Sequence, residues 1–189
     1  MKNIIAGVDE VGRGSLVGPV YAAAVILKKN LDKKKLKDSK KLTKRNREIL
    51  EKHIKKNSYW SIGSASLKEI EKLNILNASL LAMKRAIRKL NKKPSHILID
   101  GNKIPKQMPC PAQAIVKGDS KHLEIAAASI LAKVGRDRIM HDLHTKHPEY
   151  GWNTNSGYGS KTHMQAIEQH GVTIHHRRSF SPVRAALAA

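Results

Sequence analysis

The sequence predicts an α/β fold with a mixed five-stranded sheet, flanking helices and a C-terminal helical segment. Two apolar runs separated by glycines, residues 3–9 and 19–27, are typical of buried strands. Two longer segments, 68–91 and 123–146, carry apolar residues at helical spacing. Strands come first, followed by helix, strand, strand and helix, and this order fits a mixed sheet. A chain of 189 residues fits a single domain, residues 1–189.

Short runs rich in isoleucine, valine and alanine predict the strands of this sheet. They are residues 3–9, 19–27, 58–67, 96–100 and 113–119. Gly101 closes the fourth run, and a glycine and asparagine-rich segment, 150–160, predicts a loop.

Apolar stripes predict the helices. The first begins near Thr43, a suitable N-cap, and carries one stripe formed by Leu42, Ile49, Leu50 and Ile54. The clearest helix covers residues 68–91, and its core-facing stripe is Ile70, Leu73, Leu76, Leu80, Met83, Ile87 and Leu90. A second long helix is predicted over 123–146 and a short one over 161–170, followed by a basic tail and a low-complexity end, AALAA.

The charge of the chain indicates its partner. Lys and Arg number 36 against 15 Asp and Glu, which gives a net charge of +21 and a pI near 10.2. Such a field attracts polyanions, so nucleic acid is the leading partner, with a merely lysine-rich protein as the alternative. No segment is apolar enough to span a membrane, and no secretory signal is present. With Cys110 as the single cysteine, we expect a cytoplasmic protein, and we expect a monomer.

Acidic residues end three of the predicted strands: Asp9, Asp100 and Asp119. If these strands are parallel neighbours, the acids converge at one edge of the sheet, where ligand sites of α/β folds gather. Carboxylates this close need a counter-charge, and Mg²⁺ or Mn²⁺ prefers such oxygen ligands. Metal ions held there could activate water against a phosphate. Three unrelated, solvated acids remain the alternative interpretation of the spacing.

Seven sequence blocks resemble, in order, those of bacterial type 2 ribonuclease H, the ribonuclease HII family. The blocks are DEVGRG, DSKKL, LIDG, KGDSKH, AAASILAKVGRDR, GYGS and HHRRSF, and the resemblance covers roughly residues 5–184. It implies the ribonuclease H-like fold. It also implies an endonuclease that hydrolyses the RNA strand of RNA–DNA hybrids. The same enzyme would act in ribonucleotide excision repair, where it would incise 5′ of ribonucleotides embedded in duplex DNA and leave 5′-phosphates.

The resemblance also implies roles for individual residues. The catalytic, metal-binding acids fall on Asp9, Glu10, Asp100 and Asp119, with two Mn²⁺ or Mg²⁺ ions as cofactors. Peptide groups of Gly12, Arg13 and Gly14 would address the ribose 2′-OH. Tyr158, which its flanking glycines indicate is exposed, would stack on the next deoxyribose. Phosphate contacts are expected from Lys40, Lys41, Lys121 and Arg178.

Some features limit this interpretation. Asn155 and Ser156 stand where the family commonly has His-Lys before Gly-Tyr, which predicts the loss of a phosphate contact. Asp137, inside a predicted helix, is interpreted as structural. A type 3 ribonuclease H is an alternative that we rank low, because the first motif begins at residue 9 and leaves no room for an N-terminal substrate-binding domain. A non-catalytic, basic nucleic-acid-binding protein is the other alternative, and contact with a replication clamp stays open.

Overall fold

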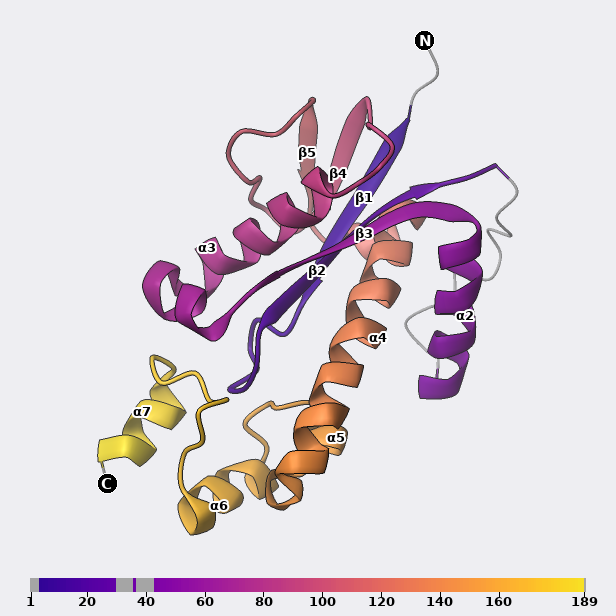
Figure 1. The fold of residues 1–189 in the computed structure, drawn as a ribbon. Helices are drawn as coiled ribbons and strands as arrows, with labels where there is room; N and C mark the ends of the chain where they lie inside the picture. Colours follow the sequence, from indigo (N-terminus) through magenta and orange to yellow (C-terminus); the bar gives the residue numbers. More distant parts are fainter. Residues whose placement is uncertain (1–3, 30–35, 37–42, 189) are drawn as a thin grey trace.

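A mixed five-stranded sheet forms the centre of the computed structural model, which describes residues 4–29, 36 and 43–188 (Figure 1). Its strands are β1 (Ile5–Val11), β2 (Val20–Leu27), β3 (Ser58–Ala65), β4 (His96–Asp100) and β5 (Ala112–Ile115), in the order β3-β2-β1-β4-β5. β2 pairs antiparallel with β1 and β3, whereas β4 pairs parallel with β1 and β5. The predicted mixed α/β sheet is confirmed, and β1, β4 and β5 are parallel neighbours.

Helices cover both faces of the sheet (Figure 1). On one face lies α3 (Leu67–Arg88), and on the other lies α4 (Leu123–Lys146), with α2 (Lys44–Lys56) packed beside it. The C-terminal helices α5 (Trp152–Asn155), α6 (Lys161–His170) and α7 (Ser181–Ala188) gather around the far end of α4. The described residues also form the short 3₁₀ helices η2 (Gly118–Ser120) and η3 (Pro148–Tyr150).

Small residues bring the two helical layers close to the sheet. Alternate positions of β2 point to opposite faces, so Ala22 and Ala24 pack with α3 while Ala23 packs with α4. On β1, a Cβ added to Gly7 would stand 2.1 Å from the backbone carbon of Glu124. The first turn of α4 therefore rests directly on the strand that carries the first two acids.

The helix α2 has the predicted N-cap, but one residue of its predicted apolar stripe is exposed. Thr43 Oγ1 accepts a hydrogen bond from the amide of Asn46 at 3.3 Å, as an N-cap does. Leu50 and Ile54 are buried against α4, but Ile49 is 59% exposed. The contact with α4 is narrow, so a side chain about 100° around the helix from Leu50 faces water. The predicted stripe residue Leu42 lies outside the described residues.

The long helix α3 is interrupted, which the apolar spacing did not predict. Asn74 has φ 65° and ψ 166°, outside the helical region, and its side chain accepts from the amide of Asn77 to start the second part. The interruption shifts the helical phase. Leu76 is therefore 36% exposed, while Ile70 and Met83, on either side, are buried in the core.

The C-terminal region is more helical than the sequence predicted. The expected loop 150–160 contains α5, and the expected tail ends in α7. Leu16 and Val17, from the connection between β1 and β2, are buried with Trp152 and Val183 of these helices. None of the helices among the described residues combines the length and apolar character that crossing a bilayer requires.

Candidate active site

The parallel pairing of β1 and β4 places Asp9 and Asp100 side by side. Val8 is in register with Ile99, so the next position of each strand carries an acid. Asp9 is 7% exposed, and its carboxylate interacts with the side chain of Ser129 on α4. Asp100 ends β4, as expected. Asp9, however, lies within β1, which continues to Val11 through its pairing with β2.

Glu10 joins this pair from the other side of the strand, since adjacent strand residues point to opposite faces. Its Oε1 receives Arg13 Nη1 at 3.3 Å, and its Oε2 is buried without a hydrogen-bond partner. The chain then turns at Gly12, whose φ of +89° favours glycine. β1 therefore continues past both acids, and the chain turns only after Val11.

The acids perturb one another. Burial, followed by the charges of Glu10 and Asp100, raises the pKa of Asp9 well above its ordinary value. Burial also raises the pKa of Glu10, against the opposing effect of Arg13, and Asp100 adds to the rise. Two buried carboxyls whose ionised forms are disfavoured in this way indicate a place where a positive charge would be stabilised.

The position of Asp119 corrects one expectation. The strand predicted over 113–119 ends at Ile115, and Lys117 turns the chain with a φ of 55°. Asp119 therefore lies in the 3₁₀ helix η2, half-buried, not at a strand end. The turn brings η2 against Asp100, because the amide of Gly118, the neighbour of Asp119, donates to Asp100 Oδ1 at 2.6 Å.

The donor set fits a hard divalent cation. All four candidate ligands offer carboxylate oxygens, which Mg²⁺ and Mn²⁺ prefer, and Glu10 Oε2 is buried with no partner that would compete. As the side chains stand, no group of three or more acidic, histidine or cysteine residues in the described part of the chain could hold a metal ion.

The candidate substrate residues lie beside the acids. A Cβ added to Gly14 would stand 3.4 Å from Cε1 of Tyr158, whose ring is 42% exposed as expected. Arg13 is also exposed. The glycine-rich loop and the tyrosine, far apart in sequence, thus form one surface next to Glu10.

The expected phosphate-binding cations fall into two groups. Lys40 and Lys41 lie outside the described residues. Lys121 and Arg178 are exposed, and the amide of Arg178 donates to Glu71 Oε1 at 3.2 Å.

A turn built by Asn155 carries Tyr158. Asn155 Oδ1 accepts from the amide of Gly157 at 2.8 Å, and its Nδ2 donates to the carbonyl of Tyr150 at 2.7 Å. Ser156 adopts a φ of 51° and presents its carbonyl to the interior. The residues at which this sequence departs from the family pattern therefore shape the approach of Tyr158 to the site.

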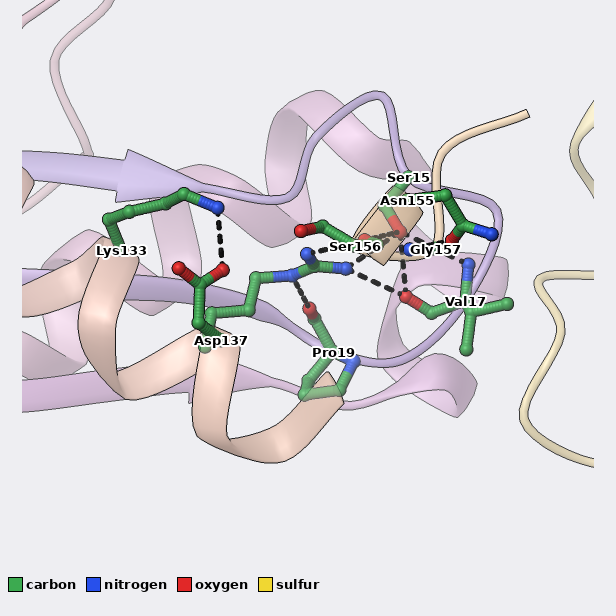
Figure 2. A network of polar contacts seen from close by, with 9 residues as sticks. Ser15, Val17, Pro19, Lys133, Asp137, Asn155, Ser156 and Gly157 are labelled. Atoms are coloured by element: carbon green, nitrogen blue, oxygen red, sulfur yellow. Dashed lines mark hydrogen bonds and ion pairs between the residues drawn. The ribbon is translucent and has the colours of Figure 1, made fainter. Parts of the chain in front are cut away.

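Two buried arginines lie behind this surface, and the sequence did not predict their burial. Arg136 and Arg177 are 1% and 0% exposed, and both donate to the loop between β1 and β2. A lone arginine in a helix or tail normally indicates a solvated charge, so no local pattern marks them. Asp137, next to Arg136, pairs with Lys133 of its own helix at 2.5 Å (Figure 2).

Comparison with known proteins gives consistent matches. A family model described as Ribonuclease HII matches residues 6–183. Ribonuclease HII of Pelagibacter ubique is 63% identical over 180 residues, covering 95% of this chain and 97% of the relative. That of Neisseria meningitidis serogroup B is 52% identical, covering 100% of this chain and 97% of the relative.

Solved structures show the same fold. Ribonuclease H2 from Pyrococcus horikoshii has a TM-score of 0.80 at 28% identity, over 96% of each chain. The ribonuclease HII of a PCNA complex from Archaeoglobus fulgidus has a TM-score of 0.72 at 25% identity, covering 96% of this chain and 97% of that one. Bst-RNase HIII in complex with Mn²⁺ has a TM-score of 0.80, but at 19% identity over 98% of this chain and 69% of that one it shows likeness of fold alone.

Proposed function

Because this chain belongs to the ribonuclease HII family and is therefore a ribonuclease H endonuclease, we propose that it incises 5′ of ribonucleotides embedded in duplex DNA, as well as the RNA strand of RNA–DNA hybrids. The family assignment sets aside both a type 3 enzyme and a non-catalytic binding protein. The products of the proposed reaction are 3′-hydroxyl and 5′-phosphate ends.

The observation that carries the proposal is the adjacency of Asp9 and Asp100 on two neighbouring parallel strands. Glu10 follows Asp9 on β1, and Asp119 lies in η2 beside Gly118, whose amide donates to Asp100. We propose that these four acids hold divalent cations. The Mn²⁺ in the structure of Bst-RNase HIII, a protein of the same fold, supports the choice of ion.

When bound, two such ions would supply Lewis acidity, assisting the attack of water and the departure of the 3′-oxygen. The chain's residues supply the rest. Asp9, buried and fixed by its contacts with the Glu10 amide and Ser129, holds its position before substrate arrives. Gly118 orients Asp100 in the same way through its 2.6 Å hydrogen bond. Ligands fixed in advance lose little freedom on binding.

Recognition of the ribonucleotide would fall to the surface formed by Gly12–Gly14 and Tyr158. Without a Cβ at Gly14, peptide groups can approach the ribose and hydrogen-bond its 2′-OH. Arg13, half exposed and paired with Glu10 at 3.3 Å, keeps other donors of its fork for a phosphate. Tyr158 would stack on the deoxyribose that follows. The net charge of +21 brings the polyanion to this surface.

The test is cleavage of a DNA duplex that contains one ribonucleotide, mapped to the nucleotide, with Mg²⁺, Mn²⁺ or EDTA. We expect incision on the 5′ side only with a divalent cation. Asp9→Asn should abolish cleavage and leave hybrid binding largely intact. Asp137→Asn is the matched control, because this acid pairs with Lys133 and should not affect turnover. Near-normal cleavage by Asp9→Asn would contradict the proposed role of the acids.

A further inference from the structure

Arg136 joins the two loops that form the candidate substrate surface. From α4, its Nη2 donates to Ser15 Oγ at 2.7 Å and to the carbonyl of Val17 at 3.0 Å. Its Nη1 donates to the carbonyl of Ser156 at 2.9 Å. Figure 2 shows these partners from the two loops lying around one point. A single side chain thus ties the glycine-rich loop to the turn that carries Tyr158.

The same side chain also supports Gly12. A Cβ added to Gly12 would stand 2.2 Å from Nε and 2.7 Å from Cδ of Arg136. The backbone of Gly12 therefore lies directly on the arginine. Any movement of the guanidinium would be transmitted to Gly12 and to the turn of Ser156 together.

These contacts use the shape of the guanidinium more than its charge. Its acceptors are the Ser15 hydroxyl and the carbonyls of Val17, Pro19 and Ser156, all of them uncharged. Arginine presents donors in a rigid planar fork, whereas a lysine has one flexible ammonium group. The two loops also meet directly, through the amide of Leu16, which donates to the carbonyl of Gly157 at 2.8 Å, and through Ser15 Oγ, which donates to the carbonyl of Ser156 at 3.3 Å. Between arginine and lysine, the fork is the side chain that can hold several acceptors from both loops at fixed separation.

Arg177 holds the glycine-rich loop independently. It is fully buried, and it donates to the carbonyl of Gly18 at 2.9 Å and to that of Arg13 at 3.1 Å. Within the part of the chain that the structure describes, its side chain donates no hydrogen bond to the turn of Asn155–Tyr158. Arg136 is therefore the arginine that spans both loops, while Arg177 fixes one of them.

We propose that Arg136 is a positioning residue that sets the separation between Gly14 and the ring of Tyr158, and through it the preference for a ribonucleotide followed by a deoxyribonucleotide. The inference rests on the proposed function, in which the glycine-rich loop contacts the ribose and Tyr158 contacts the next sugar. A junction is recognised only if both contacts form at once, so their spacing determines the preference.

The experiment compares two substrates: a DNA duplex with one ribonucleotide, and a hybrid with an all-RNA strand. For each, kcat and KM are measured with saturating Mn²⁺, and the ratio of kcat/KM values gives the junction preference. Arg136→Lys should lower this preference by about tenfold or more, since a displacement of about 1 Å at a site can cost about a hundredfold. Arg138→Lys is the matched control, because Arg138 lies on the same helix but pairs with Glu51 of α2, at 2.7 Å through Nη1.

A double-mutant cycle separates positioning from general damage. If Arg136 acts through Tyr158, Arg136→Lys should reduce the junction preference of wild type but hardly change that of Tyr158→Ala. Equal loss on both substrates, additive losses in the cycle, or an unchanged preference would each overturn the proposal.

Folding is checked by circular dichroism and thermal melting. Should Arg136→Lys fail to fold, Ser15→Ala removes one acceptor of the fork and keeps the arginine. We then expect the preference to fall by about threefold, and an unchanged preference would overturn the proposal. The proposed function is judged separately, on wild type. If wild type does not incise at the embedded ribonucleotide, the proposed function fails. If wild type does incise there and Arg136→Lys keeps the junction preference, only the inference about Arg136 fails.

Discussion

Gly14 lies against the ring of Tyr158, with room for a Cβ 3.4 Å from the nearest ring carbon. The loop after the first strand and the turn after α5 therefore meet at van der Waals distance. Two residues separated by most of the chain form one recognition surface, and changes to either can be designed from this contact.

Replacement of Gly14 by alanine should leave the fold intact and impair substrate recognition. The added methyl group has ordinary contact distances, and Gly14 has no positive φ. It would occupy the space between loop and tyrosine, so we expect kcat/KM on a duplex with one ribonucleotide to fall by about ten- to a hundredfold. Steady-state kinetics and a melting curve test this; a large drop in Tm would contradict it.

The equivalent change at Gly12 should instead destabilise the protein. Its φ is +89°, and its Cβ would stand 2.2 Å from the buried side chain of Arg136. Overpacking and strain together should lower the free energy of unfolding by roughly 2 to 4 kcal/mol. Urea denaturation of Gly12→Ala beside Gly14→Ala measures the contrast, and equal stabilities would show that the loop yields to the added methyl group.

Asp9→Asn should make the metal-free protein more stable while removing its activity. Burial and the charges of Glu10 and Asp100 raise the pKa of Asp9, so its ionised form is disfavoured at neutral pH. The amide keeps an oxygen for the Glu10 amide, which donates to Asp9 Oδ1 at 2.7 Å, but carries no charge. In EDTA we expect a Tm higher by roughly 3 to 6 °C, following relief of about 1 to 2 kcal/mol.

Once Mn²⁺ is added, wild type should have a higher Tm than Asp9→Asn. A cation that binds only the folded protein raises the Tm of wild type, and Asp9→Asn should lose most of that rise. Calorimetric melts with and without Mn²⁺ test both statements. A Tm of Asp9→Asn below that of wild type in EDTA would show that the Asp9 carboxylate stabilises the metal-free protein.

The histidine pair His163 and His176 should make stability depend on pH. Trp152 Nε1 donates to His163 Nε2 at 3.0 Å, and His176 Nε2 lies 3.2 Å from the same atom. Burial, with the charge of His163 next, lowers the pKa of His176 to about 4, and burial lowers the pKa of His163. The neutral form of both rings is therefore favoured in the folded protein.

The direction of this pH dependence follows from proton uptake by the unfolded chain. The unfolded chain binds protons on these histidines near pH 6.5, before the folded chain does, so stability is full above about pH 6.5 and falls as the pH drops towards 4. His176 alone accounts for a loss of about 3 kcal/mol at most. Urea titrations from pH 7.5 to 4.5 should show a shallower slope for His176→Gln. Parallel slopes would contradict the assignment.

Much of the fold and half of the candidate site could be predicted from local pattern. β4 and α4 have the expected bounds, because a short apolar run is typical of a buried strand and a long apolar repeat at helical spacing is typical of a helix. Asp9 and Asp100 follow from the same logic, since acids that follow buried strands meet when the strands are parallel. The pairing of β1, β4 and β5 supplies that condition.

The remaining features depend on contacts that no local pattern encodes. The left-handed turn at Lys117 ends β5 early, although lysine shows no preference for that conformation. Asn74 interrupts α3 inside an otherwise regular apolar repeat. Arg136 and Arg177 are buried because carbonyls of a distant loop surround them, and that arrangement exists only in the folded chain.

The parallel pairing of β1 with β4 also has a consequence during protein synthesis. Ile4, at the start of β1, donates its amide to the hydroxyl of Ser95, 91 residues further along the chain. A nascent chain that has emerged only as far as α3 carries Asp9 and Glu10, but neither Asp100 nor the strand that orients it. Arg136 and Arg177 emerge later still. A chain made in this order cannot form its candidate site while half synthesised, so the two acids of β1 wait for a strand that leaves the ribosome 91 residues later.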